Sequence, residues 1–467
     1  MTQIHAGADV AKKLADWCLD LRAEEIPDDV LAKAEDCIID AIASAVPGQD
    51  VDGARRIHAV ANTTYSQGDA AIWFTDKRLH PTGAAFANAA SASILDIDDG
   101  HRMALGHPGA AVVPAALAAA SDTMVSGDDL LVAVIAGYEA CIRIGRAEKR
   151  KAYHTGNWSG FGACVARARL AGLNAEQLTH ALAITAYHGP RVADLTLSAD
   201  MGSNVKESIP WSVVAGMTAV DLALEGFTGS RDALDIEERF DPAAALEGLG
   251  QGFLITRTYF KRYSACRWIH SPIEALLALM EEHNIAPGDV EEVRVDTFHQ
   301  AASLNNYADP HSLESAQYSI PYCLGLAAAL GESALMPVSA ANLHNAEVVA
   351  LASKVKVVHV KEMDSAFPAN VPAHVFIRTD RGTFDTHILL PWGEPDRAPA
   401  RGELVAKFHA LAEGRLQALQ LDEIVAATEG LRRGTVAPLL SALQASAPIA
   451  AVTQKGDAQL TLSGEAR

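Results

Sequence analysis

Basic residues are scarce in this chain, which has 38 lysines and arginines against 58 aspartates and glutamates and a formal net charge of −20. A protein this acidic is repelled by nucleic acid and by anionic membrane surfaces, so we expect neither as a partner. An anionic small molecule is compatible with this charge only where histidine, lysine and arginine side chains gather locally against the overall field.

The chain also lacks paired cysteines and long hydrophobic runs. Its longest apolar runs, near 110–120 and 129–137, are too short to cross a bilayer. The first residues, "MTQIHAGADVAKKLADW", show neither the basic start nor the apolar stretch of a signal peptide. The six cysteines form no CxxC pair, which favours reduced thiols in a helical core and a cytoplasmic protein: Cys18, Cys37, Cys141, Cys164, Cys266 and Cys323.

The stretch "DIDDGHRMALGHPG" (96–109) is rich in carboxylates and imidazoles, yet it matches no established metal motif. An EF-hand loop starting at Asp96 needs glycine and glutamate at its sixth and twelfth positions, where this chain has His101 and His107. No HExxH motif occurs, and two histidines six residues apart are only a loose zinc pattern. We therefore expect no metal.

Motifs for nucleotides and for serine hydrolysis are missing as well. The segment "GLGQGF" (248–253) is not GxGxxG, and no GxxxxGK[ST] motif is present. In "GNWSG" the serine stands one position away from that of a nucleophile elbow. Hydride transfer, phosphoryl transfer and serine hydrolysis therefore lack their usual machinery.

Alanine-rich segments with helical spacing of apolar residues dominate the first half of the chain. Aromatic residues make up only 6% of the sequence, and runs such as "AAVVPAALAAA" allow helices to approach closely. Capping residues and the apolar period predict helices throughout residues 7–250, among them 28–46, 126–150, 158–173, 174–187 and 212–229.

The pattern changes after about residue 265. Alternating segments rich in β-branched residues predict four strands: 290–298, 354–360, 373–379 and 382–391. The last two are separated by "DRG" and form a hairpin candidate. Helices are predicted before, between and after these strands: 271–284, 313–331, 345–353, 402–420, 422–430 and 434–446. The α+β region thus reads as an insertion, with the last helices rejoining the first part of the fold.

Polar, proton-competent residues recur at the ends of otherwise apolar helices. A helix over 82–98 carries Asp96, Asp98 and Asp99 to its C-terminal end, where carboxylates oppose the helix dipole. Further candidates precede later helices: His107, Tyr153, His154, Lys206, Lys261, Arg267 and His270. Each alone also fits a structural hydrogen bonder or a solvated helix end, but active sites are assembled from such positions.

Several segments in order resemble the MmgE/PrpD family, whose members include 2-methylcitrate dehydratase, cis-aconitate decarboxylase and iminodisuccinate epimerase. They include "AAFANAASASILDIDDGH", "GHPGAAVVPAALAAA", "GLNAEQLTHALAITA", "YFKRYSACRWIHSPIEAL" and "SAQYSIPYCLGLAAALG". The resemblance implies a mainly α protein, with a large all-helical domain from both chain ends (1–265 and 400–467) and a smaller α+β lid domain (266–399). It also implies a homodimer without a metal or an organic cofactor.

The resemblance carries the family's active-site residues onto Asp96, His107, His154, Lys206 and His270. We expect neighbouring polar side chains to bind the substrate: His101, Lys261, Arg267 and Tyr318. The sequence departs from the family where Gly100 replaces a threonine, which bears on substrate identity.

The function expected from these residues is a cofactor-independent lyase on a small di- or tricarboxylic acid. Without a metal, protonated lysine or histidine must meet the charge that develops when a proton beside a carboxylate is removed. Loss of water, as in 2-methylcitrate dehydratase, is our first hypothesis, and epimerisation of a succinate-type acid and decarboxylation follow. A non-catalytic carboxylate-binding protein is the alternative outside enzyme chemistry.

Overall fold

The computed structural model describes residues 7–122, 124–149, 154–191, 202 and 205–444. In this part of the chain the protein is mainly α-helical, as predicted, with three small sheets. None of the described helices has the length and hydrophobicity to span a lipid bilayer.

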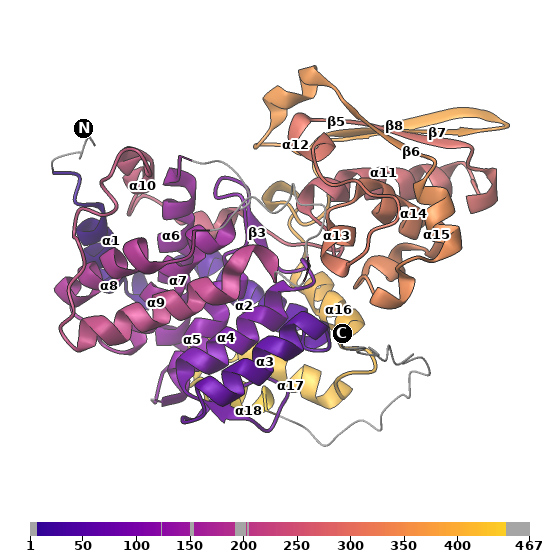
Figure 1. Cartoon of the computed structure of the whole chain (residues 1–467). Helices are drawn as coiled ribbons and strands as arrows, with labels where there is room; N and C mark the ends of the chain where they lie inside the picture. The colour runs from indigo at the N-terminus through magenta and orange to yellow at the C-terminus, as the bar shows by residue number, and fades with distance from the viewer. Residues whose placement is uncertain (1–6, 123, 150–153, 192–201, 203–204, 445–467) are drawn as a thin grey trace, which may run out of the picture.

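Helices from both ends of the chain share one hydrophobic core. Its buried residues run from Val10 to Phe260 and resume from Leu404 to Leu443. Figure 1 shows the yellow helices of the C-terminal part lying against the indigo and purple N-terminal helices. The helices are α1 (Val10–Asp20), α2 (Asp28–Gly48), α3 (Asp52–Thr64), α4 (Pro81–Ser93), α5 (Gly109–Ala119), α6 (Gly127–Ala147), α7 (Ser159–Leu170), α8 (Ala175–His188), α9 (Ile209–Leu224), α10 (Pro242–Leu246), α16 (Arg401–Ala412), α17 (Ala418–Glu429) and α18 (Ala437–Ala442).

Small residues allow the central helices of this body to pack closely, as the sequence predicts. A Cβ atom on Gly216 of α9 would lie only 2.1 Å from the carbonyl oxygen of Gly160 in α7. The two helices can therefore touch only because neither residue carries a side chain. This contact holds α9, which begins at Ile209, three residues after Lys206.

Residues 263–388 form a second body around a separate hydrophobic core, which runs from Tyr263 to Ile377. Its sheet has the strand order β6-β5-β7-β8 and stands apart from the helical body in Figure 1. The strands are β5 (Glu292–Thr297), β6 (Val355–His359), β7 (Ala373–Thr379) and β8 (Gly382–Ile388), and the helices are α11 (Arg267–Glu282), α12 (His299–Ala302), α13 (Leu313–Gln317), α14 (Ile320–Leu330) and α15 (Ala346–Ala352).

All four predicted strands are present, and the predicted hairpin is confirmed. Strands β7 and β8 pair antiparallel up to Thr379 and Gly382, whereas β5 and β6 pair parallel. Alternate residues of β7 are buried, and α11 and α14 cover that face of the sheet. The predicted helix over 313–331 is wrong in one respect, because it breaks at Tyr318 between α13 and α14. Ser319 caps the second helix, and Pro321 lies in its first turn.

Two short ladders complete the helical body. Strands β1 (Ala70–Ala71) and β2 (Arg78–Leu79) pair before α4. Strands β3 (Gly100–His101) and β4 (Thr258–Tyr259) pair antiparallel, with Gly100 opposite Tyr259. The second ladder joins the loop between α4 and α5 to the segment that leads into the second body.

Candidate active site

The loop between α4 and α5 begins earlier than the sequence predicts. The predicted helix over 82–98 is present as α4, but its predicted end is wrong: α4 ends at Ser93, and the three aspartates lie beyond the last helical turn. Distant side chains hold the loop: the Ser264 hydroxyl donates to the Leu95 carbonyl, and Lys261 Nζ donates to the Asp96 carbonyl at 2.9 Å. Asp96 itself has a φ of 51°, a left-handed conformation that is incompatible with a right-handed α-helix.

Two lysine ammonium groups converge on the fully buried carboxylate of Asp96. Lys206 Nζ lies 2.7 Å from Oδ2, and Lys261 Nζ donates a hydrogen bond to Oδ1. Both lysines are at most 2% exposed. Charges this deeply buried are stable only when they are paired, so the three side chains form one electrostatic unit.

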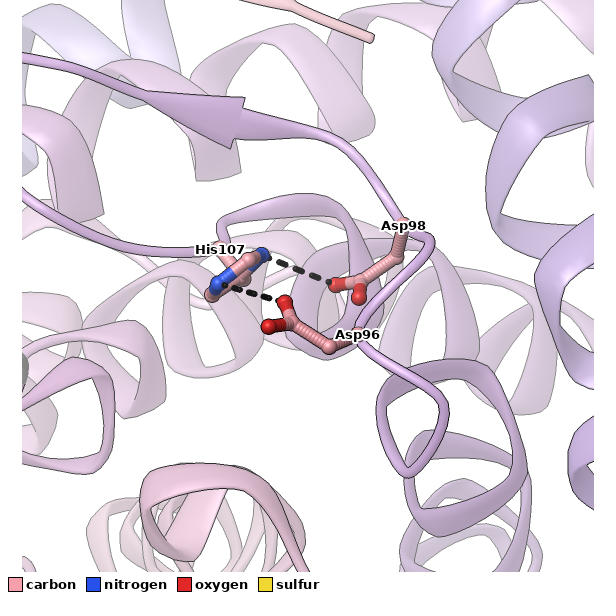
Figure 2. Close-up of side chains that lie close together, drawn as sticks. All are labelled: Asp96, Asp98 and His107. Atoms are coloured by element: carbon pink, nitrogen blue, oxygen red, sulfur yellow. Dashed lines mark ion pairs between the residues drawn. The ribbon is translucent and has the colours of Figure 1, made fainter. Parts of the chain in front are cut away.

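His107 completes this unit from the other end of the loop. Its Nε2 atom lies 3.4 Å from Asp96 Oδ1, and its Nδ1 atom lies 2.8 Å from the Asp99 carbonyl oxygen and 3.4 Å from Asp98 Oδ2. In Figure 2 a dashed line joins each ring nitrogen to a different carboxylate, Asp96 or Asp98. An imidazole in this position can carry a proton with an anion near each nitrogen.

Lys206 and Glu207 lie in a turn with an unusual backbone. Four consecutive residues, Val205 to Ser208, have φ values of 37°, 23°, 52° and 65°. Each left-handed residue of this kind costs on the order of 1–2 kcal/mol. The contacts of the two buried side chains are therefore needed to hold the turn that starts α9.

Tyr318 joins the cluster from the second body. Its hydroxyl accepts a hydrogen bond from Lys206 Nζ and donates one to Glu207 Oε1 at 3.2 Å. The ammonium group also lies 4.2 Å from the centroid of the tyrosine ring. The break between α13 and α14 is what presents this tyrosine to the helical body.

The environment shifts the pKa values of the cluster in opposite directions. Burial alone would raise the pKa of Asp96, but Lys206, Lys261 and His107 hold it well below its ordinary value. Burial opposes a charge on Lys206, yet Asp96 and Glu207 raise its pKa above the ordinary value. Burial lowers the pKa of Lys261, and the Lys206 charge adds to this shift against the attraction of Asp96.

The pKa values of His107 and Asp99 are both raised. Burial would lower the pKa of His107, but Asp98 and Asp96 raise it in spite of the nearby Lys261. Burial raises the pKa of Asp99 to about 7, and the carboxylates of Asp40 and Asp98 add to the shift. Asp99 accepts hydrogen bonds from the Tyr138 hydroxyl at 2.6 Å and from the Gly109 amide at 2.9 Å, so it ties the loop to α5 and α6.

Asp96, Asp98 and His107 each offer one ligand atom within reach of the others, which is the minimum for a metal site. The donor set suits a cation poorly, however, because two ammonium groups already occupy the Asp96 carboxylate. A divalent ion at this position would have to displace both lysines or stand close to their charges.

The structure places His154 and His270 at the edges of this cluster. His154 is buried and precedes Thr155, whose amide donates to Glu207 Oε2 at 3.1 Å. His270 lies on α11, where its Nε2 atom is 3.2 Å from the Ala265 carbonyl oxygen and Arg267 approaches its Nδ1 atom at 3.3 Å. Burial and the Arg267 charge hold the pKa of His270 well below its ordinary value, so this imidazole is neutral.

Two other predicted residues have their main contacts outside the cluster. Arg267, the first residue of α11, is 1% exposed and donates to Glu394 Oε1 at 2.7 Å and to the Trp392 carbonyl at 2.9 Å. It therefore holds residues 392–394 against the start of α11. His101 lines a different cavity of about 320 Å³, together with Arg146 and Arg257. The predicted Tyr153 lies outside the described residues.

Sequence reasoning missed two buried charges that shape the site. Glu207 contacts Thr155, Lys206 and Tyr318, but it stands next to a predicted residue and shows no motif. Lys407 of α16 donates to Asp40 Oδ1 at 2.6 Å and to the Ile97 carbonyl at 2.7 Å. A lysine among the apolar positions of a predicted amphipathic helix is the only signal that could have identified it.

A cleft of about 670 Å³ lies between the helical body and the second body. Its walls include Leu95 and Val205, which immediately precede Asp96 and Lys206. Across the cleft stand Ser312, Glu314 and Ser339. Asp96 and Lys206 do not line the cleft themselves, but the residues before them do, and the cleft is large enough for a small organic acid.

Comparison with known proteins extends over nearly the whole chain. The MmgE/PrpD N-terminal domain family matches residues 12–246, and the MmgE/PrpD C-terminal domain family matches residues 263–430. These ranges contain Asp96, His107, Lys206 and Tyr318, and Lys261 stands just outside them.

Several similar proteins are named for the same activity. A cis-aconitate decarboxylase of Aspergillus terreus is 25% identical over 478 aligned residues, which cover 94% of this chain and 96% of the fungal protein. The cis-aconitate decarboxylase of Mus musculus is 27% identical over 50% of this chain and 49% of its own length. That of Homo sapiens is 27% identical over 47% of each chain.

Proposed function

The chain belongs to the MmgE/PrpD family, and on this basis we propose that it is a lyase acting on a small di- or tricarboxylic acid. One observation carries the proposal: two ammonium groups and an imidazole from distant segments meet at one buried carboxylate, Asp96. Preorganised cations in a site from which water is excluded stabilise negative charge as it develops on a substrate.

The opposite pKa shifts of the two lysines support different roles for them. Lys206, with its raised pKa, stays an ammonium group and holds a substrate carboxylate or the enolate-like charge. Lys261, with its lowered pKa, gives up a proton more readily and is suited to proton transfer. His107, supported by Asp96 and Asp98, is the proton donor to carbon or to a leaving group.

Decarboxylation is the reaction we propose first, because the full-length fungal relative is named a cis-aconitate decarboxylase. In this reaction the carbon–carboxylate bond breaks, carbon dioxide leaves, and the electron pair is stabilised by the cations until carbon takes up a proton. A hydro-lyase reaction is the second candidate, because His107, whose pKa Asp98 and Asp96 raise, is suited to protonate a leaving hydroxyl.

Three further expectations are part of this proposal. We propose that the second body, which has its own core, acts as a lid over the cleft. We also propose that the chain works as a homodimer. We propose further that catalysis needs no metal or organic cofactor, since the lysines and His107 supply the positive charge at the site.

A panel of acids in deuterated water tests the proposal. Purified protein is incubated with cis-aconitate, citrate, 2-methylcitrate and succinate-type acids, and the products are followed by proton nuclear magnetic resonance and by carbon dioxide release. Decarboxylation releases carbon dioxide and leaves deuterium on carbon, dehydration yields an alkene without carbon dioxide, and epimerisation exchanges deuterium with inversion.

The control is a matched pair of variants. Lys206→Met removes the fixed cation, whereas Lys12→Met removes an exposed lysine that pairs with Asp16 on α1. Turnover that is lost only in Lys206→Met supports the proposed site. Binding of acids without turnover of any of them would instead favour a non-catalytic carboxylate-binding protein.

A further inference from the structure

Glu207 connects three segments of the chain around the buried cluster. Its Oε2 atom accepts hydrogen bonds from the amide and the hydroxyl of Thr155, the residue after His154. Its Oε1 atom accepts the Tyr318 hydroxyl at 3.2 Å and lies 3.8 Å from Lys206 Nζ. Both carboxylate oxygens are thus engaged, and the residue is only 7% exposed.

These contacts form a continuous chain of hydrogen bonds. Lys206 Nζ donates to the Tyr318 hydroxyl, which donates to Glu207, which in turn accepts from Thr155. Because Glu207 can only accept, it fixes the direction of the Tyr318 O–H bond and leaves the tyrosine oxygen free to accept from Lys206. The ammonium group is thereby held between Tyr318 and Asp96.

We propose that Glu207 is a positioning residue, whose carboxylate sets the place and charge of Lys206 and Tyr318 and ties both to the His154 segment. This inference rests on the proposed function, since it assigns Glu207 a role in the same reaction. It goes beyond that proposal because Glu207 itself touches neither Asp96 nor, as we propose the reaction, the substrate.

The left-handed turn supports the assignment. Glu207 has a φ of 52° within the run of four residues from Val205 to Ser208. A strained non-glycine backbone persists only where the surroundings determine it strongly, and such strain gathers at functional sites. The two bonds to Thr155 and the bond to Tyr318 are the restraints that keep Glu207 in place.

The charge of Glu207 also has a direct electrostatic effect. The ionisable groups that face Lys206 are Asp96, Glu207, Lys261 and Cys266, and those that face Tyr318 also include Glu314. An added anion stabilises the lysine ammonium group and disfavours tyrosinate, so Glu207 raises both pKa values. Removal of this one charge shifts both titrations toward lower pH.

The test compares three variants on whichever acid the unaltered protein turns over. Glu207→Gln keeps the shape and removes the charge, Glu207→Asp keeps the charge on a shorter side chain, and Glu139→Gln alters a buried glutamate that pairs with Arg143 in α6. We measure kcat and KM separately, and confirm folding of each variant by circular dichroism.

We expect Glu207→Gln to lower kcat about tenfold or more with KM within about threefold. Glu207→Asp, which keeps the carboxylate, should recover part of the lost kcat, and Glu139→Gln should leave kcat and KM unchanged. A loss of kcat in Glu207→Gln no greater than in Glu139→Gln, or no recovery in Glu207→Asp, overturns the inference.

A measurement without turnover separates this inference from the proposed function. If the unaltered protein converts no acid, the proposed function fails, and crystal structures of the unaltered protein and of Glu207→Gln decide on Glu207. Displacement of Lys206 Nζ or of the Tyr318 hydroxyl in Glu207→Gln supports the positioning role. Identical positions of both groups in the two structures refute it.

Discussion

Lys407 is a side chain through which the C-terminal part of the chain contacts the loop between α4 and α5. It is 4% exposed, and its ammonium group donates to Asp40 Oδ1 and to the carbonyl of Ile97, which stands between Asp96 and Asp98. Replacement by methionine keeps most of the volume and removes the charge. It leaves a buried carboxylate on α2 and an unpaired carbonyl in the loop.

The expected loss of stability follows from the fate of Asp40. Burial raises the pKa of this carboxyl from its ordinary 3.8, and Lys407 is the main opposing influence. Without the lysine, Asp40 can avoid a buried charge only by taking up a proton, at about 1.4 kcal/mol per pH unit above its ordinary pKa. Lys407→Met therefore costs about 4 kcal/mol at pH 7, within the range typical of a broken buried ion pair.

The cost depends on pH with a definite sign. In Lys407→Met, Asp40 binds its proton more tightly in the folded protein than in the unfolded one, so stability falls as the pH rises above about 4. At pH 5 the loss should therefore be below about 2 kcal/mol. Urea unfolding followed by circular dichroism at pH 5 and pH 7 measures both values.

Two controls make the test specific to the buried pair. Lys12→Met breaks an exposed pair with Asp16 and should cost less than about 1 kcal/mol at either pH. The double variant Lys407→Met, Asp40→Asn has no uncompensated charge and should recover most of the lost stability. Our reasoning is refuted if Lys407→Met is no less stable than Lys12→Met, or if its loss is the same at both pH values.

Three further predictions concern the loop and its partners. Lys206→Met should reduce kcat by about 100-fold or more, since it removes the cation beside Asp96, and steady-state kinetics with near-normal turnover would contradict this. Gly100→Ala should lower the free energy of unfolding by about 1–3 kcal/mol, because its Cβ would lie 2.3 Å from the Tyr259 hydroxyl oxygen; an unchanged midpoint in urea would show that the ring moves freely. The pKa of Asp99 is raised to about 7, so its folded form holds the proton more tightly and stability should fall as the pH rises from about 4 to 7. Asp99→Asn should flatten that dependence in urea titrations, and an unaltered slope would exclude Asp99 as its source.

The sequence is sufficient to predict most of the elements and the change of texture near residue 265. Strands such as β7 alternate between buried and less buried positions, and the alternation of apolar and polar residues in the sequence predicts this pattern. The end of α4 is different, because it depends on Ser264 and Lys261, which bond to Leu95 and Asp96 from far along the chain. The local sequence pattern does not contain these long-range contacts, so it predicts an end of α4 that is too late.

The candidate site divides in the same way. Asp96, His107 and Lys206 were predicted because polar residues at helix ends stand out from their apolar surroundings, and the structure brings these three together. Glu207 and Lys407 were missed because their importance lies entirely in their partners. Thr155, Tyr318 and Asp40 are all more than 50 positions away from the residue that they contact.

Under the proposed function, a chain with a net charge of −20 must bind a polyanion, and the cluster supplies the local positive charge that this requires. Desolvation of two ammonium groups costs free energy, and this cost is already met when the protein folds and both groups pair with Asp96. A substrate carboxylate that replaces Asp96 on one lysine exchanges one buried ion pair for another, so little further desolvation of the protein is needed. The exchange frees part of the Asp96 carboxylate next to His107, at the point where the proposed reaction needs a proton to move. Binding and activation of the acid would then be consequences of the same displacement.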